Sequence, residues 1–482
     1  MDAQIRRLAL VLLVMFLSLF VKLNDLQVVR AERLANAPGN TRQATRDFSR
    51  ERGVIQTADG AVVAESVDVG GAFERLRRYP EGELFAHVAG YFSFTFGAEG
   101  VERTYNAELA GRSVALRRLT DVLSERVRTG NVTLTLSKGL QQVARDALGA
   151  RRGAVVALNP TDGAVLAMWS FPSFDPNPLA AHDQAAVQAT WAELQADPSQ
   201  PLLPRSYRRN YAPGSTFKVV TAAAALERRP ELASKAYPTL RALDLPQTDA
   251  DLPNFGGSAC GGTLPDLLRV SCNTGFAQMG LDLGAADLAA EAGEFGFRSR
   301  PPLDLPAVAT SVFPEAEAFE RDQPGLAKSA IGQEDVAATP LQMALVAAAV
   351  ANGGVVMKPH VMAEIRDDQG ELVRAHQPEP WMQPMSPESA AALRDMMVAV
   401  VARGTAGRAA VPGVAVAAKT GTAQTVGDNS HAWLVAFAPA EAPRVAVAVI
   451  VESQPGLGDS LTGGRVAAPI AQAVLNAALG SP

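Results

Sequence analysis

A run of apolar residues opens the chain, with basic residues on both sides of it. The run extends from Leu8 to Val21 and ends at Lys22. Its fourteen residues would span about 21 Å as a helix, less than the roughly 30 Å of a bilayer core. Ile5 and Leu23 lengthen the segment, and the side chains of Arg7 and Lys22 can reach the headgroups. The pattern therefore predicts one transmembrane helix within residues 1–30.

A cleaved signal peptide is the alternative explanation of this segment. Ala35-Asn36-Ala37 offers a cleavage site of the small-x-small type, but it lies well beyond the apolar run, and Pro38 follows it directly. An uncleaved anchor is therefore favoured. Basic residues on its N-terminal side place that end in the cytoplasm and the remainder of the chain outside.

Residues 31–150 are polar and rich in arginine, and their pattern predicts only short elements. Val54-Ile55, the turn at Asp59-Gly60 and the apolar run 61–64 indicate a strand, a turn and a second strand. Residues 132–136 alternate as a strand does, and 139–148 are helical in pattern. None of these residues carries evident chemistry, which is typical of a spacer or docking module.

The chain becomes more apolar from about Gly153. The apolar runs that predict strands are 154–158, 164–169, 433–438 and 445–451, and the predicted helices include 219–226 and 467–479. The first of these helices is apolar on every side, so we expect it at the centre of the fold. Strands at both ends with helices between them indicate an α/β domain whose first and last strands share one sheet.

Composition and charge exclude several functions. The chain has 482 residues, enough for two or three domains, and 48% of them are hydrophobic. Its net charge of -6 argues against nucleic acid as a main ligand. The five histidines have no metal-ligand spacing, and no phosphate-binding loop of the Walker type is present. We therefore expect the chemistry to come from ordinary side chains, without metal or cofactor.

The two cysteines, Cys260 and Cys272, form an even pair in a chain that we expect to be exported. A disulfide between them is favoured in that compartment. Two buried thiols are the alternative, because the sequence does not give the separation of the two Cβ atoms.

Ser215-Thr216-Phe217-Lys218 stands just before the apolar helix. A serine there is commonly an N-cap, and an acidic or amide residue often follows three positions later. Lys218 occupies that position instead, where a cation opposes the helix dipole. Residues three apart share one face of a helix, and a desolvated lysine can take the proton of a serine. Ser215 and Lys218 are therefore candidates for nucleophile and base.

Two further short motifs follow in the chain. Ser271-Cys272-Asn273 falls between predicted helices, and Lys419-Thr420-Gly421, with Thr422 after it, follows the strand-like segment 414–418. Alone, the first is typical of a turn and the second of an edge strand with a glycine bulge. Each of the three patterns (S-x-x-K, S-x-N, K-[ST]-G) occurs once in the sequence. This set in this order is the motif set of penicillin-binding proteins and class A β-lactamases.

On these residues the chain resembles the class B penicillin-binding proteins, the peptidoglycan D,D-transpeptidases. The likeness extends well beyond the three motifs, from the N-terminal region to the C-terminal strands. The matching segments are 52–55 with 59–60 and Ala64, 97–102 with 109–111, 159–163, 211–218, 332–333, 339–343 and 352–354. Asn40-x-Arg42 and the preference for alanine and arginine are similar to the actinobacterial penicillin-binding protein A branch.

The resemblance implies a fold and a division into domains. We expect a transmembrane anchor in residues 1–30, an N-terminal pedestal and docking domain in 31–150, and a transpeptidase domain in 151–482. The last is expected to have the α/β (α+β) fold of the penicillin-binding proteins and serine β-lactamases, with an antiparallel sheet between helical layers. The protein is then a single-pass protein of the bacterial cytoplasmic membrane, with its catalytic domain outside.

The resemblance also implies residue roles. Ser215 attacks the D-Ala-D-Ala end of a stem peptide and Lys218 is the base, while Ser271 and Asn273 carry the proton onward and hold the substrate amide. Lys419 and Thr420 hold the substrate carboxylate, and Gly421 lets backbone and substrate approach closely. The backbone N–H groups of Ser215 and Thr422 form the oxyanion hole.

Alternatives remain at this point. A D,D-carboxypeptidase or a β-lactamase shares the motifs but transfers the acyl group to water, and a catalytically dispensable scaffold or a β-lactam sensor would only bind. The anchor and the long N-terminal region favour the cross-linking enzyme. The implied partners are peptidoglycan stem peptides, β-lactams and a multi-pass glycosyltransferase of the SEDS type. A role in cell division is not distinguished from one in cell shape.

Overall fold

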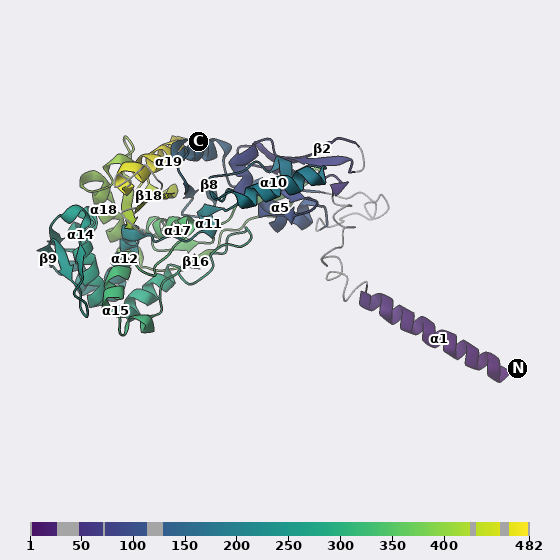
Figure 1. Ribbon diagram of the computed structural model, residues 1–482, viewed down its shortest axis with the longest axis horizontal. Coiled ribbons are helices and arrows are strands. Elements are labelled where there is room, and N and C mark those ends of the chain that lie inside the picture. Colours follow the sequence, from purple (N-terminus) through teal and green to yellow (C-terminus); the bar gives the residue numbers. More distant parts are fainter. Residues whose placement is uncertain are drawn as a thin grey trace.

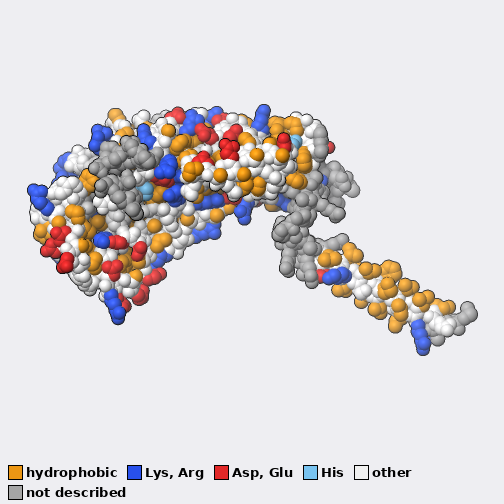
Figure 2. Space-filling model, in the orientation of Figure 1, with side chains coloured by type: hydrophobic (Ala, Val, Ile, Leu, Met, Phe, Trp, Pro, Cys, Tyr) orange, Lys and Arg blue, Asp and Glu red, His pale blue; other side chains and the backbone are white. Residues whose placement is uncertain are grey.

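The computed structural model describes residues 2–26, 48–70, 73–112, 129–424, 430–453 and 462–480. Figure 1 shows these residues as an elongated body, from which helix α1 (Asp2–Asn24) stands apart. Residues 4–24 of α1 are long and apolar enough to cross a membrane, with a mean hydropathy of 2.0, and they are exposed. Hydrophobic side chains cover the face of α1 that Figure 2 displays. The apolar pattern thus forms one continuous helix that buries nothing within the protein.

A five-stranded antiparallel sheet forms the centre of the larger part of the body. Its order is β17-β18-β19-β7-β8. The first two strands of this part, β7 and β8, thus lie in the same sheet as the last three, because β7 pairs with β19. The bounds are β7 (Gly153–Leu158), β8 (Val165–Phe171), β17 (Ala417–Gln424), β18 (Ser430–Ala438) and β19 (Val445–Val451). β17 is an edge strand, and β7 and β19 are buried along their whole length. The predicted sharing of one sheet by the first and last strands is confirmed.

Helices cover the two sides of the sheet. α8 (Lys138–Leu148) packs on β8 and α19 (Ala468–Gly480) on β19, while α17 (Pro340–Ala351) packs on β7, β18 and β19. α12 (Lys218–Arg228) is buried from Lys218 to Ala225 and contacts α15 (Asn273–Glu294) and α18 (Pro387–Arg403). An all-apolar helix has no face for solvent, which explains the central place of α12 and α17. The predicted antiparallel sheet between helical layers is confirmed, as are the helices expected at 139–148, 219–226 and 467–479.

Shorter elements complete this part. They are α9 (Asn177–Ala180), α10 (Gln184–Ala196), α11 (Arg205–Arg208), η3 (Gly214–Thr216), α13 (Pro230–Ser234), β9 (Tyr237–Leu240), β10 (Ala242–Asp244), β11 (Asp251–Pro253), η4 (Phe255–Gly257), β12 (Cys260–Gly262), α14 (Leu264–Val270), η5 (Ala316–Phe319), α16 (Gln323–Ser329), β13 (Val356–Met357), β16 (Pro380–Met382), η6 (Gly407–Ala409) and the π-helix η8 (Gly463–Ala467).

A second, six-stranded sheet lies near the end of the body that carries β2 in Figure 1. Its order is β15-β14-β6-β1-β2-β3, in which only β1 and β6 pair in parallel. The bounds are β1 (Ile55–Gln56), β2 (Val62–Asp68), β3 (Arg75–Arg78), β6 (Gly130–Leu134), β14 (Met362–Asp367) and β15 (Leu372–Ala375). Small elements beside it are η2 (Gly82–Phe85), α4 (Ala86–Ala89), β4 (Phe92–Ser93), β5 (Gly97–Ala98), α5 (Gly100–Thr104) and α6 (Asn106–Leu109). Strands from residues 362–375 thus complete a sheet that begins at residue 55.

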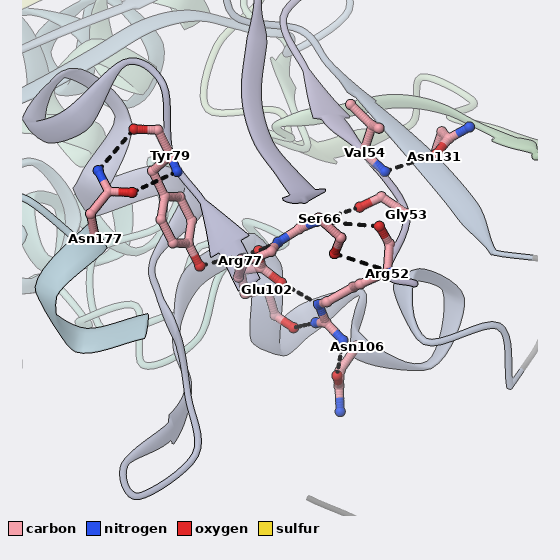
Figure 3. A network of polar contacts seen from close by, with 10 residues as sticks. All are labelled: Arg52, Gly53, Val54, Ser66, Arg77, Tyr79, Glu102, Asn106, Asn131 and Asn177. Atoms are coloured by element: carbon pink, nitrogen blue, oxygen red, sulfur yellow. Dashed lines mark hydrogen bonds and ion pairs between the residues drawn. The ribbon is translucent and has the colours of Figure 1, made fainter. Parts of the chain in front are cut away.

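A buried ion triad joins the segments of this sheet (Figure 3). The carboxylate of Glu102, on α5, accepts hydrogen bonds of 2.6 Å from Arg52 Nε and of 2.6 Å from Arg77 Nε. The Arg77 guanidinium also donates to the carbonyl of Gly53 at 2.9 Å. Burial alone would raise the pKa of Glu102, but its ion pairs with Arg77 and Arg52 outweigh burial and hold that pKa below its usual value. One carboxylate therefore pairs with cations from two other segments of the chain.

We expect Glu102→Gln to destabilise the protein by roughly 3–5 kcal/mol, because two buried guanidinium groups would lose their counter-charge. Urea unfolding of the detergent-solubilised protein, followed by circular dichroism, measures this change. Glu65→Gln is the matched control, since Glu65 pairs with the exposed Arg78 and should contribute about 1 kcal/mol or less. Equal effects of the two substitutions would contradict the structural role of the triad.

Candidate active site

Ser215 lies in a tight turn rather than at the N-cap of a helix. The turn is η3, and α12 begins only at Lys218. Thr216 stabilises the turn by donating from Oγ1 to the carbonyl of Pro213 at 2.7 Å. Gly214 has φ of +52°, and a Cβ there would lie 2.8 Å from the carbonyl oxygen of Thr422. Ser215 is half-buried and faces a cleft, so its hydroxyl is accessible to a ligand.

Lys218 is fully buried at the first position of α12. Its Nζ donates to the carbonyl oxygen of Ser271 at 2.8 Å and to Oδ1 of Asn273 at 2.7 Å, and lies 3.5 Å from Oγ of Ser271. All these partners are neutral. The two residues of the S-x-N motif therefore hold the amine of the S-x-x-K motif beside the turn that carries Ser215.

Lys419 approaches Ser271 from the opposite side. Its Nζ donates to Oγ of Ser271 at 2.8 Å and to the carbonyl oxygen of Thr420 at 2.9 Å. Burial lowers the pKa of Lys419 to about 7. Burial, and secondly the charge of Lys419, lowers the pKa of Lys218 well below its usual value. Both effects disfavour the charged form of Lys218, which is the direction that suits a proton acceptor.

The loop that carries Ser271 and Asn273 is fixed by neighbours that the motifs do not include. Ser271 ends α14 in the left-handed conformation, with φ of 60°. Oδ1 of Asn254 accepts hydrogen bonds from the backbone N–H of Asn273 at 2.9 Å and of Thr274 at 3.0 Å, which caps α15. Sequence reasoning missed Asn254, because a cap supplied from a distant segment leaves no local signal.

Cys272, the middle residue of the S-x-N motif, forms a disulfide with Cys260. Their Cα atoms are 5.8 Å apart, and Cys260 lies on β12 beside the cleft. The cross-link ties the loop between α14 and α15 to the small sheet of β9 and β12. It therefore restricts the position of both Ser271 and Asn273.

The K-T-G motif lies within β17 rather than after a strand, since β17 runs from Ala417 to Gln424. This edge strand packs on η3. A Cβ at Gly421 would lie 3.0 Å from the carbonyl oxygen of Pro213 and 3.0 Å from Cγ2 of Thr216. The missing side chain thus lets the strand approach the turn of Ser215. The sequence led us to expect a close approach of backbone and substrate at Gly421. The crowding at this turn is an approach of backbone, and the approach of substrate stays a prediction.

These segments surround a cleft of about 1240 Å³. Ser215, Ser271, Asn273, Thr420 and Thr422 line it, while Lys218 and Lys419 lie behind the lining at 0% exposure. Within the described residues, no group of three or more His, Cys, Asp or Glu side chains is placed to hold a metal ion. Ser215 thus lines the same cleft as Ser271, whose hydroxyl contacts two buried amines, and this arrangement is suited to acyl transfer to serine.

The chain is similar to known proteins in sequence and in fold. Residues 153–476 match the family described as penicillin binding protein transpeptidase domain, and residues 52–132 match the penicillin binding protein A dimerisation domain. The chain is 41% identical to peptidoglycan D,D-transpeptidase PbpA of Mycolicibacterium smegmatis and 39% identical to PbpA of Mycobacterium tuberculosis, over 99% of each chain. The structure of penicillin-binding protein A from M. tuberculosis, as a ceftriaxone acyl-enzyme, has a TM-score of 0.84 and 38% identity, covering 90% of this chain and 100% of that one.

We predict that Lys419→Met changes the pH profile of the rate at which a fluorescent penicillin acylates Ser215. The acid limb of this profile should move to higher pH. The charge of Lys419 disfavours a second charge on Lys218, so its removal raises the pKa of Lys218, and more of this amine stays protonated at a given pH. Stopped-flow labelling across pH 5–9 measures the limb. Lys235→Met is the control, because Lys235 pairs with Asp282 at the surface. An acid limb unchanged by Lys419→Met would contradict the assignment of Lys218 as base.

Proposed function

The chain belongs to the penicillin-binding protein transpeptidase family, and on that premise we propose that it cross-links peptidoglycan through an acyl-enzyme on Ser215. The observation that supports this proposal best is the burial of Lys218 beside Lys419, with Ser271 between the two amines. A neutral amine next to a serine is the activation that acyl transfer requires. The donor substrate is a stem peptide that ends in D-Ala-D-Ala.

In the acylation step, Oγ of Ser215 attacks the carbonyl carbon of the penultimate D-Ala while its proton passes to Nζ of Lys218. The backbone N–H groups of Ser215 and Thr422 stabilise the resulting oxyanion, and one such donor typically contributes about 10²–10³ in rate. The C–N bond then breaks, and the proton passes by way of Ser271 to the nitrogen of the leaving D-Ala. Its carboxylate is held by Lys419 and Thr420, and Asn273 holds the substrate amide.

In the second step, an amine of another stem peptide attacks the ester carbonyl of the acyl-enzyme. A new amide forms, the ester bond breaks, and the proton lost by the amine restores the hydroxyl of Ser215. If water attacks instead, the product is that of a D,D-carboxypeptidase, or of a β-lactamase when the acyl group comes from a β-lactam. The anchor and the long N-terminal region favour the amine as acceptor, because cross-linking takes place at a polymer beside the membrane.

The apolar helix α1 supports a further part of the proposal, a single-pass anchor in the cytoplasmic membrane with the body on the outer side. Its length and hydropathy are sufficient for one span, and Arg6 and Arg7 lie toward its N-terminal end. We expect the pedestal and the anchor to contact a multi-pass glycosyltransferase of the SEDS type. Cross-linking of α1 to such a protein in native membranes would support this partner, and cross-linking to lipid alone would argue against it.

The division at residue 150 stays a prediction, and we propose it as the boundary between the pedestal and the transpeptidase domain. The two family matches, 52–132 and 153–476, fall on either side of it. Strand β14 nevertheless pairs with β6 across this boundary. Removal of residues 31–150 would therefore take away β6 and leave β14 paired with β15 alone, so separate folding of the second segment is not expected.

We expect benzylpenicillin to add its own mass to the wild-type protein, and Ser215→Ala to abolish the adduct, because Ser215 is the proposed nucleophile. Intact-mass measurement over hours follows the adduct. An adduct that lasts for hours favours the transpeptidase, whereas one lost within seconds favours a β-lactamase. Folded wild-type protein that forms no adduct would support the dispensable scaffold instead.

A further inference from the structure

The segment from the end of β11 to the start of β12 forms a wall of the cleft that the mechanism above does not use. Residues 250–258 all line the cleft. Within this segment the side chain of Asn254 is only 4% exposed, whereas that of the next residue, Phe255, is exposed. A buried amide needs hydrogen-bond partners within the protein. The partners of Asn254 therefore show what this wall is attached to.

The side-chain amide of Asn254 is held in one orientation. Its Nδ2 donates to the carbonyl oxygen of Leu240 at 2.8 Å and to that of Ser258 at 3.1 Å. Its Oδ1 accepts from the backbone N–H of Asn273 at 2.9 Å and from that of Thr274 at 3.0 Å. A reversed amide would place N–H groups against N–H groups and oxygen against oxygen. The wall is thus attached in a defined way to the first turn of α15.

Asn273 is held by two consecutive residues of this wall. Its backbone N–H is bound by Asn254, and its Nδ2 donates to the carbonyl oxygen of Pro253 at 3.1 Å. The other polar atom of its side chain, Oδ1, accepts from Nζ of Lys218 at 2.7 Å. Because Nδ2 faces Pro253, Oδ1 faces Lys218. The segment Pro253-Asn254 therefore determines which end of the Asn273 amide meets the buried amine.

The contact with Asn273 affects the direction in which Lys218 can accept a proton. A neutral amine has two hydrogens and one lone pair, and acceptors for both hydrogens lie close to Nζ: the carbonyl oxygen of Ser271 at 2.8 Å and Oδ1 of Asn273 at 2.7 Å. The other groups that face Nζ are the ring of Phe276 and, across the Ser271 hydroxyl, the amine of Lys419. With both hydrogens bound, the lone pair takes the remaining direction around the nitrogen.

We propose that Asn254 is a positioning residue for acylation, because it holds Asn273 so that the lone pair of Lys218 is directed at the proton of Ser215. Asn254 acts through Asn273 and takes no part in the proton transfer itself. The inference rests on the proposed function, because it concerns the base of that reaction. The alternative is a purely structural role, in which Asn254 caps α15 and the amine of Lys218 is oriented without it.

Stopped-flow acylation of the full-length protein in detergent by a fluorescent penicillin, across pH 5–9, distinguishes the two roles. The dependence on probe concentration separates the dissociation constant of the first complex from the first-order rate constant of acylation. The variants are Asn254→Ala and Asn254→Asp. Asn177→Ala and Asn177→Asp are the matched controls, since the amide of the half-buried Asn177 holds the backbone N–H and carbonyl of Tyr79 at 2.9 and 3.0 Å but does not line the cleft.

We expect Asn254→Ala to lower the first-order rate constant of acylation by roughly 10- to 100-fold, because a small misplacement of a reacting group can cost about that much in rate. The dissociation constant should change by about threefold or less, a difference below 1 kcal/mol. Both Asn177 variants should acylate as the wild type does. Circular dichroism verifies that each variant is folded.

Asn254→Asp preserves the shape of the side chain and an oxygen for both backbone N–H groups, since aspartate is a good N-cap. It should therefore retain more of the rate constant than Asn254→Ala on the pH-independent part of the profile. The new carboxylate lies next to Asn273 and favours the protonated form of Lys218. This raises the pKa of Lys218, so the acid limb should move to higher pH by about one unit. Asn177→Asp adds the same charge and should leave the limb in place.

An unchanged acid limb in Asn254→Asp would overturn the proposal, because the amine would then be insensitive to the residue that is said to position it. A weaker first complex with an unchanged rate constant in Asn254→Ala would also overturn it, and so would equal losses in the Asn177 variants. Failure of the proposed function itself looks different, since the wild-type protein would then form no adduct even at saturating penicillin.

Discussion

The chemistry proposed for this protein depends on one buried amine, that of Lys218, whose charged form the fold disfavours. Lys218 is buried with neutral hydrogen-bond partners, and Lys419 lies on the other side of the Ser271 hydroxyl. Each ammonium disfavours the charge of the other, and burial disfavours both, which together lower the pKa of Lys218. This arrangement costs stability, because two desolvated amines replace what could be a packed apolar core. The rest of the fold must therefore offset this cost in free energy. It must also keep three segments that are distant in the sequence in fixed positions.

The fold supplies this support through backbone contacts rather than through opposite charges. The edge strand β17 can approach the turn of Ser215 because Gly214 and Gly421 have no side chains there. Behind the turn, the Tyr211 hydroxyl donates to Oε1 of Glu452 at 2.7 Å, and Arg205 Nε donates to the same oxygen at 2.8 Å. The carboxylate that does balance buried cations thus lies behind the nucleophile. A carboxylate beside Lys218 would raise the pKa of that amine and favour its protonated form, so the proposed role of Lys218 as base depends on the separation of the two.

Much of this arrangement was predictable from the sequence, and the exceptions share one physical cause. The all-apolar helix, the strand patterns and the three motifs are local signals, and they led to the helical layers, the edge strand and the residues around Ser271. Asn254 and Pro253 were missed because their roles come from contacts between distant segments: Asn254 caps α15, and the carbonyl of Pro253 accepts from the side chain of Asn273. The 3-10 turn at Ser215 leads directly into α12, so the predicted helix start lies close to the observed one, and the short turn itself leaves no separate signal in the sequence.

The sheet at the N-terminal end adds a constraint on how the enzyme can work at a membrane. Strands β14 and β15 follow α17 in the chain and pair into the sheet that begins with β1, so the pedestal and the transpeptidase domain share a sheet rather than a flexible linker. The triad centred on Glu102 fixes the segments of the pedestal on that sheet. In Figure 1, α12 and β18, which carry parts of the site, lie toward the opposite end of the body from α1. Because these two parts share a sheet, the cleft keeps a fixed position relative to the first strands of the body.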